Sequence, residues 1–324
     1  MSETHENIDI FIHRSPHTTA QDFDFFHDEL RQPEFHVYAP ESAGLDRHFQ
    51  RGLEKIAKGD GKVYQEVMSR TNPDSMWGAT FRGLFMSRKP IHLFDATEQQ
   101  IAADPVLSSF GEYTQTPSSA AQVVQETRSH LLRGALYLAK RDTIIANNIE
   151  QWLPGVIGAH PRLRTLGTVG LYMTIGDNHQ LVDQILMERG FRVHTNKDVI
   201  LGPREAATNK YLMKQEPDES EILRAAAMPF IRSFVAHKST NKLRQILNDG
   251  LSDFQFDHLS DLLDEVRTND LVAIHEYLGW LLTDNSIEES GLEFVDPSSQ
   301  KPDIALKQSI EVRNGITGIR TGIF

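Results

Sequence analysis

Cysteine is absent from the 324-residue chain. Its absence excludes disulfide bonds, thiolate nucleophiles, and zinc ribbons or iron–sulfur clusters held by cysteine. It also fits the reducing environment of the cytoplasm. Segment 1–9 is polar and acidic and lacks the basic and apolar regions of a signal peptide. The sequence therefore predicts a cytoplasmic protein.

Long hydrophobic runs and an excess of basic residues are also absent. No apolar stretch approaches the roughly 18 residues that a membrane-spanning helix needs, so we expect no membrane partner. The chain has 33 Lys and Arg against 45 Asp and Glu, a formal net charge of −12. Nucleic-acid phosphates require a basic surface, so we expect no nucleic-acid partner either. The 39% share of hydrophobic residues is sufficient for a folded core.

Short apolar segments alternate with helical patterns in the first two thirds of the chain. Five segments rich in β-branched or aromatic residues are predicted strands: 8–12, 35–39, 91–94, 170–175 and 191–194. Helical spacing of apolar residues predicts helices over 18–30, 120–153 and 180–188. The alternation predicts an α/β fold, with a largely parallel sheet built from duplicated βαβ units and helices on both faces.

The pattern changes after residue 215. Four helices without intervening strands are predicted at 219–236, 240–248, 256–267 and 270–283. We therefore expect three parts along the chain: an α/β catalytic or binding domain over 1–215, a helical C-terminal appendage over 216–290, and an irregular tail over 291–324.

Polar side chains follow the predicted strands. Segment 14–17 is a predicted turn ending in His17, and His179 occupies the equivalent point of the second βαβ unit. Glu41 and Asp95 follow two further strands. Ligands of open parallel sheets bind at the carboxyl ends of the strands, so we expect a site there. Histidines beside carboxylates transfer protons near neutral pH. The same set could instead bind a divalent metal, so both chemistries stay open.

Two other residues have a physical case for a role at this edge. Gly176 stands between a strand and a helix, where it lets the backbone turn tightly and approach a ligand. Arg141 offers a planar fork of donors suited to a carboxylate, a phosphate or an oxyanion. Structural roles are the alternatives: an ion pair with Glu150 for Arg141, and turn or core hydrogen bonds for single His and Asp residues at strand ends.

Two short motifs resemble a known superfamily. Gly176-Asp-Asn-His179 matches a Gly-x-x-His element, and the segment Arg141–Ile149 resembles an Arg-Asp-x-x-Met-Ala-x-Asn-Ile stretch. Glu41 lies where an acidic residue is expected. Over residues 8–200 the chain thus resembles the superfamily that groups TraB/PrgY-type proteins, TIKI proteases, erythromycin-esterase-like enzymes and ChaN-like haem-binding lipoproteins. Its first Gly-x-x-His element departs from the pattern, because Arg14 replaces glycine.

The resemblance implies a hydrolase acting on a peptide or ester bond. His17 and His179 would be general bases or metal ligands, Glu41 a second base or metal ligand, and Arg141 the oxyanion stabiliser. The residues implied in substrate binding are Arg14, Asp95, Gly176 and Asp177. TIKI-like members are metal-dependent, whereas esterase-like members act through a histidine base, so a divalent-metal cofactor stays open.

The replacement of glycine by Arg14 favours an alternative. On that reading, the chain is a non-enzymatic binding or regulatory protein that sequesters a peptide or small ligand in the same pocket. A third hypothesis is that the helical segment after residue 216 binds a protein partner.

Overall fold

The computed structural model describes residues 7–15, 29–45, 47–73, 75–109, 119–195, 201–232, 235–236, 251, 254–268 and 293–294. They fall into two compact units. The first contains the described residues of 7–109 and 137–195, and the second those of 119–136 and 201–294. Helix α7 (Ala120–Ala159) contributes residues to both. Within the described residues, no helix combines the length and apolar composition that crossing a membrane requires.

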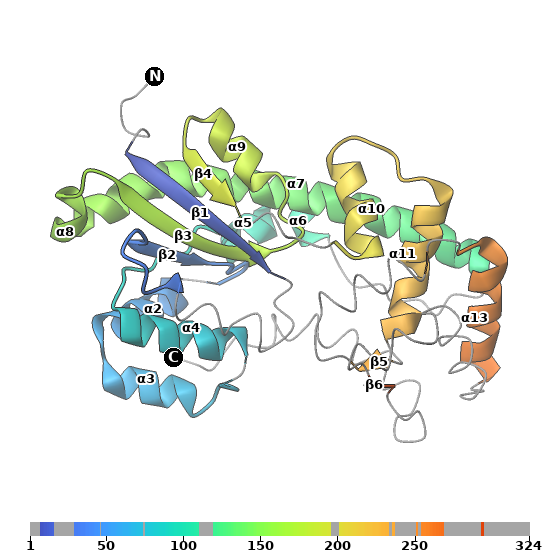
Figure 1. Ribbon diagram of the computed structural model, residues 1–324, viewed down its shortest axis with the longest axis horizontal. Coiled ribbons are helices and arrows are strands. Elements are labelled where there is room, and N and C mark those ends of the chain that lie inside the picture. The colour runs from blue at the N-terminus through green and yellow to red at the C-terminus, as the bar shows by residue number, and fades with distance from the viewer. Residues whose placement is uncertain are drawn as a thin grey trace. The chain divides into compact units, whose positions relative to one another are not determined.

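The first unit is built on a sheet of four parallel strands. These are β1 (Ile8–Ser15), β2 (Val37–Pro40), β3 (Val169–Gly176) and β4 (Arg192–Thr195). Their order across the sheet is β2-β3-β1-β4 (Figure 1). The α/β fold class and four of the five predicted strands are confirmed. β1 and β3, which precede the two Gly-x-x-His-like elements, are central neighbours, with Ser15 opposite Gly176.

The predicted strand at 91–94 is wrong for most of its length. Only Ile91 pairs with the sheet, through a parallel bridge to Tyr38. The His92 N–H donates to the Tyr38 carbonyl at 3.0 Å. The ladder cannot continue because the next donor on β2 would be Pro40, which has no N–H. The N–H of the next residue, Leu93, donates to Oε1 of Gln50 at 2.9 Å.

The turn predicted at 14–17 also needs correction. Arg14 and Ser15 belong to β1, where they pair with Ile175 and Gly176. The strand continues because β3 runs alongside it as far as Gly176, so the ladder hydrogen bonds extend to the same point. Residues 16–28 lie outside the described part of the chain, and with them His17 and most of the predicted helix 18–30.

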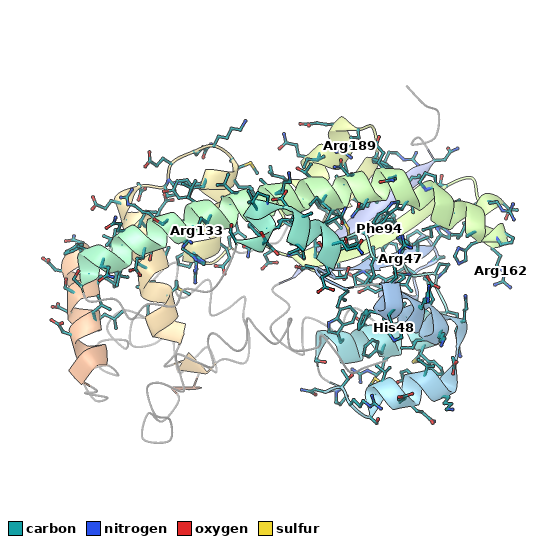
Figure 2. All side chains as sticks on the ribbon, turned by 180° about the vertical axis from the view of Figure 1, so that it is seen from behind. Arg47, His48, Phe94, Arg133, Arg162 and Arg189 are labelled. Carbon is teal, nitrogen blue, oxygen red and sulfur yellow. The ribbon has the colours of Figure 1, made fainter. Side chains whose placement is uncertain are left out.

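One face of the sheet packs against α7, which runs behind the strands in Figure 1. Ile8, Ile10 and Ile12 of β1 point to this face, since alternate strand residues share a side, and each is at most 4% exposed. Ile145 and Ile149, one helical turn apart on α7, belong to the same core. Further core residues are Val37, Ala39, Phe94, Leu171, Met173, Ile175, Val182, Leu186 and Phe191. Figure 2 shows α7 from the other side, with Phe94 alongside it.

The opposite face of the sheet is aromatic. The ring of Phe35 stacks on that of Tyr172 at 4.6 Å and meets that of Phe11 at 4.8 Å. Gly170 admits the segment before β2, because the Glu34 carbonyl oxygen lies 1.9 Å from the position that a Cβ on Gly170 would occupy. The two faces therefore differ in kind, aliphatic against α7 and aromatic on the other side.

Short helices connect the strands of the first unit. They are α2 (Arg47–Lys58), α3 (Gly61–Met68), α4 (Met76–Ser87), α5 (Glu98–Ala103), α6 (Pro105–Ser108), α8 (Pro161–Arg164) and α9 (Val182–Glu188). Gln50 of α2 holds the segment beside β2, because its Nε2 donates to the Ile91 carbonyl at 2.9 Å. This contact fixes the backbone that leads to Asp95.

The second unit is mainly helical. It contains the N-terminal part of α7 with α10 (Pro203–Leu212), α11 (Glu219–Arg232) and α13 (Phe256–Thr268). Its core includes Leu131, Ala207, Ile222 and Ala225. The helix predicted over 219–236 is wrong at its end, because α11 stops at Arg232 and residues 235–236 form the strand β5 (Val235–Ala236). β5 pairs with β6 (Glu293–Phe294), so the tail predicted to be irregular contains a short strand. The predicted helices at 240–248 and 270–283 lie outside the described residues.

Candidate functional site

Polar residues from three segments meet at the carboxyl edge of the sheet. Glu41 follows β2, Asp95 follows the segment paired with β2, and His179 follows β3. The backbone N–H of Glu41 donates to the Thr174 carbonyl of β3 at 2.8 Å, which fixes the end of β2 against its neighbour. The meeting of Glu41, Asp95 and His179 follows from parallel strands that end at one edge.

Helix α7 supplies two consecutive residues to this cluster, Arg141 and Asp142. Both are buried, at 7% and 0% exposed. Neighbouring residues of an α-helix point about 100° apart, so they reach different targets. Arg141 contacts the group after β2, and Asp142 contacts the group after β3. Two consecutive residues of α7 thus connect the ends of the adjacent strands β2 and β3.

Arg141 binds two carboxylates. Its Nε and Nη2 donate to Oδ1 and Oδ2 of Asp95 at 2.9 and 2.5 Å, a bidentate pair. Nη2 also donates to Oε1 of Glu41 at 2.7 Å. The Asp95 oxygens accept further bonds from the backbone N–H groups of Ser42 (2.9 Å) and Ala96 (2.7 Å). The carboxylate of Asp95 is therefore fully engaged within the protein.

Asp142 holds His179. The Nδ1 atom of His179 is bonded to Oδ1 of Asp142, while Oδ2 accepts the Leu181 N–H at 2.9 Å. The four residues from Gly176 form a tight turn closed by the His179 N–H to the Gly176 carbonyl at 3.1 Å. The bond at Nδ1 fixes the ring so that Nε2 faces Glu41. The tight turn predicted from Gly-x-x-His is confirmed.

Glu41 connects the two halves of the cluster. Its Oε1 lies 2.7 Å from Nη2 of Arg141 and 3.4 Å from Nε2 of His179. Its Oε2 accepts the Gly176 N–H at 2.6 Å. The side chain of Glu41 is 17% exposed, against 8% for Arg141, 3% for Asp95, 2% for His179 and 0% for Asp142. Of these five side chains, Glu41 is therefore the most accessible to water.

The cluster carries internal charge. Burial lowers the pKa of His179, but Asp142 and Glu41 raise it more, to about 9. Burial raises the pKa of Asp95, but Arg141 lowers it more, so it lies below its usual range. Burial likewise opposes the charge of Arg141, yet Asp95 and Glu41 hold its pKa well above the ordinary value. At neutral pH an imidazolium and a guanidinium therefore lie together among carboxyl groups.

Sequence reasoning missed Asp142 as the partner of His179. Its signal was its position in the apolar stripe of α7, between Leu138 and Ile145, because a charged residue in such a stripe needs a partner. Asn148 was missed as well. Its Nδ2 donates to the carbonyls of Phe94 (2.9 Å) and Asp95 (3.3 Å), so α7 also holds the backbone of the segment that carries Asp95.

Tyr137 and Ser42 also adjoin the cluster. Burial raises the pKa of Tyr137, whose hydroxyl lies within the field of Arg141, Asp95 and Glu41. The hydroxyl of Ser42 is buried and has no hydrogen-bond partner among the described residues. Neither residue has a sequence signal of its own.

Of the other predicted site residues, Gly176 and Arg14 are hydrogen-bonded to members of the cluster. Arg14 donates to the His179 carbonyl from Nε (3.1 Å) and Nη2 (2.9 Å). Asp177 is 4% exposed, and its carbonyl accepts a bond from Gln180. Gly176 ends β3. The role of His17 stays a prediction, because that residue lies outside the described part of the chain.

The described residues do not fit a metal ion. No group of three His, Asp or Glu side chains among them is arranged to hold one. The carboxylate of Glu41 already accepts from Arg141 and Gly176, and that of Asp142 from Leu181 and His179. The guanidinium of Arg141, 2.7 Å from Glu41, would also repel a metal cation bound to that carboxylate. The predicted ligand set of His17, Glu41 and His179 includes one residue that the structure does not describe.

Comparisons of the chain with family models, with curated proteins and with solved structures gave no match.

Proposed function

We propose that the protein is a hydrolase of the TIKI, TraB or erythromycin-esterase-like type, acting on an ester or peptide bond at the carboxyl edge of the sheet. The observation that carries the proposal is the placement of Glu41, which lies between Arg141 (2.7 Å) and His179 (3.4 Å) and is the most exposed of the five clustered side chains. A carboxylate next to a charged imidazole supplies a base and an acid at one point.

The proposed reaction uses these two groups in turn. Glu41 accepts a proton from a water molecule while the water oxygen adds to the substrate carbonyl carbon. The positive charge of Arg141 stabilises the resulting oxyanion. The imidazolium of His179 donates its Nε2 proton to the leaving alkoxide or amine as the carbon–oxygen or carbon–nitrogen bond breaks. The proton on Glu41 then passes to His179 across the 3.4 Å contact. One water is consumed, and both residues return to their starting states.

This proton relay requires no metal. It therefore differs from the metal-dependent mode of the TIKI-like members. It shares a catalytic histidine with the esterase-like members, although His179 is the acid here and Glu41 is the base. The donor set supports that choice, since the oxygens of Glu41 and Asp142 already have partners within the protein.

Glu41→Gln tests the proposal. The substitution keeps the shape of the side chain and removes the base. Wild type, Glu41→Gln and the surface control Arg189→Gln are assayed on p-nitrophenyl acetate and butyrate and on a fluorogenic peptide library, with and without EDTA. We expect turnover by wild type and control that EDTA leaves unchanged, and a loss of at least about 100-fold in Glu41→Gln. Equal turnover by Glu41→Gln, with its melting temperature unchanged, would refute the proposal.

The second candidate is a binding protein that retains the cluster without turnover. The burial of His179 and Asp142 favours it, because side chains that are at most 2% exposed leave almost no surface for a substrate to contact. Peptides that bind the wild-type chain and are recovered intact after prolonged incubation would support this candidate over hydrolysis.

A further inference from the structure

Arg14 is buried under the turn that carries His179. Its side chain is 4% exposed, and it lies on the same face of β1 as Ile10 and Ile12. Nε and Nη2 both donate to the backbone carbonyl of His179, at 3.1 and 2.9 Å. Nη2 also lies 3.1 Å from Oδ1 of Asp183, in the first turn of α9. The guanidinium therefore connects the end of β1 to the turn at His179 and to the start of α9.

These contacts complete the anchoring of His179. Its N–H is bonded to Gly176, its ring to Asp142, and its carbonyl to Arg14. The first two bonds fix the start of the turn and one ring atom. The peptide group after His179 is held on both sides, because the Gln180 N–H donates to the Asn178 carbonyl at 3.0 Å and the His179 carbonyl accepts from Arg14. The two donors of Arg14 are the link from this peptide group to β1, and they hold it firmly because a guanidinium is rigid and planar.

We propose that Arg14 is a positioning residue of the site, which holds the backbone of His179 so that its imidazole stays between Asp142 and Glu41. The assignment rests on the proposed function, in which His179 acts on the substrate. This positioning role differs from the role in substrate binding that was expected from the sequence. Both hydrogen bonds from the Arg14 side chain to His179 go to the backbone carbonyl of His179. On this assignment, the arginine in place of glycine stabilises the position of His179, and its presence does not indicate that the site has lost its function.

The ion pair with Asp183 offers a competing explanation, in which Arg14 merely secures the start of α9. The two explanations separate by substitution. Asp183→Asn removes the ion pair and keeps both bonds to the His179 carbonyl, whereas Arg14→Gln removes the ion pair and both of these bonds. Arg192→Gln is a control for the loss of an exposed Arg–Asp pair. It breaks the pair between β4 and β1, in which Nε of Arg192 lies 2.6 Å from Oδ1 of Asp9 and the side chains are 53% and 22% exposed.

The experiment compares these variants and Arg14→Lys in the full-length chain. The first readout is the downfield proton NMR resonance of the His179–Asp142 hydrogen bond, assigned by its absence in His179→Gln. The second is kcat and KM on the best p-nitrophenyl ester. In Arg14→Gln we expect the resonance to broaden or vanish and kcat to fall roughly 10- to 100-fold, with KM within about twofold. Arg14→Lys should recover part of both, and Asp183→Asn and Arg192→Gln should match wild type.

Three results would overturn the assignment. They are an unchanged resonance and kcat in Arg14→Gln, a raised KM with an intact resonance, and equal effects of Asp183→Asn and Arg14→Gln. Thermal unfolding shows whether each variant is folded. If Arg14→Gln fails to fold, Arg14→Lys and Asp183→Asn decide between the two explanations. The NMR readout requires no turnover, so a wild-type chain without hydrolase activity would refute the proposed function while the resonance still decides the role of Arg14.

Discussion

In the described part of the chain, each face of the central sheet has a histidine whose Nδ1 contacts a carboxylate. On the α7 face the pair is His179 and Asp142, whose side chains are 2% and 0% exposed. On the aromatic face it is His13 and Glu29, 3.3 Å apart, with side chains 24% and 34% exposed. In each pair the carboxylate also accepts a further hydrogen bond, Asp142 from Leu181 and Glu29 from Tyr172.

The difference between the faces lies in burial and in neighbouring charge. On the α7 face, Glu41 and Arg141 join the pair, and water has little access to Arg141, His179 and Asp142, whose side chains are at most 8% exposed. On the aromatic face, solvent reaches both members, so their attraction is screened and contributes little. The residue types alone would not distinguish the two pairs. The surroundings of the two pairs are the reason why the proposed chemistry is assigned to the α7 face.

The largest expected effect is at Arg141. Arg141→Met leaves Glu41 and Asp95 close together without their shared cation, so we expect a loss of about 3–5 kcal/mol in the free energy of unfolding. Arg189→Met is the control. Arg189 is labelled in Figure 2, and its ion pair with Glu150 is partly open to solvent, with side chains 22% and 47% exposed. We expect the free energy of unfolding of Arg189→Met to fall by less than about 1 kcal/mol. Urea denaturation measures both, and similar losses would contradict the importance of burial.

The protonation of His179 should make stability depend on pH. Its pKa of about 9 in the folded chain exceeds the ordinary 6.5. The protonated form is therefore favoured by folding, and its contribution is complete below pH 6.5 and is lost as the pH rises through about 9. At 1.36 kcal/mol per pKa unit the change is about 3 kcal/mol. Urea denaturation from about pH 6 to about pH 10 should show this fall in wild type but not in His179→Gln. If the stabilities of wild type and His179→Gln fall in parallel as the pH rises, the predicted contribution of His179 is ruled out.

The two histidine–carboxylate pairs can be compared directly by removing each carboxylate charge. We expect Asp142→Asn to cost about 3 kcal/mol, because it leaves a buried imidazolium without its counter-charge. Glu29→Gln should cost about 1 kcal/mol or less, because solvent screens His13 and the amide can still accept from Tyr172. Melting temperatures and urea midpoints check both values. An equal or larger loss in Glu29→Gln would reverse the comparison.

The smallest expected effect is at Ser42, beside Glu41. Its buried hydroxyl has no partner among the described residues, unlike the carboxylates around it. Removing an unpaired buried hydroxyl is neutral or stabilising, so we expect Ser42→Ala to change the free energy of unfolding by no more than about 1 kcal/mol, towards greater stability. A clear fall in melting temperature would show that this oxygen makes a stabilising hydrogen bond.

The sequence predicted the parts of the site that depend on local pattern. Apolar β-branched runs marked β1 and β3, and residues directly after strands marked Glu41, Asp95 and His179. The turn at Gly176 followed from one glycine between a strand and a helix. These inferences succeed because strand ends of a parallel sheet share an edge, whatever the details of packing.

The pairing inside the site was not predictable in the same way. Asp142 and His179 are 37 positions apart in the chain, and only the packing of α7 on the sheet brings them together. The role of Arg14 likewise depends on the continuation of β1 beside β3 as far as Ser15, opposite Gly176. The sequence pattern predicted a turn at residues 14–17 instead. The early end of the strand at Ile91 depends on the missing N–H of Pro40 in a neighbouring strand.

The claim that the α7 face encloses a charged histidine is tested most directly by a titration of His179. The ring nitrogens of the labelled chain are followed by ¹⁵N NMR as the pH is raised, with His179→Gln used for assignment. We expect His179 to stay protonated through neutral pH and to titrate near the pKa of about 9, held there by Asp142 and Glu41 against the effect of burial. A pKa at or below the ordinary value of 6.5 would contradict the claim.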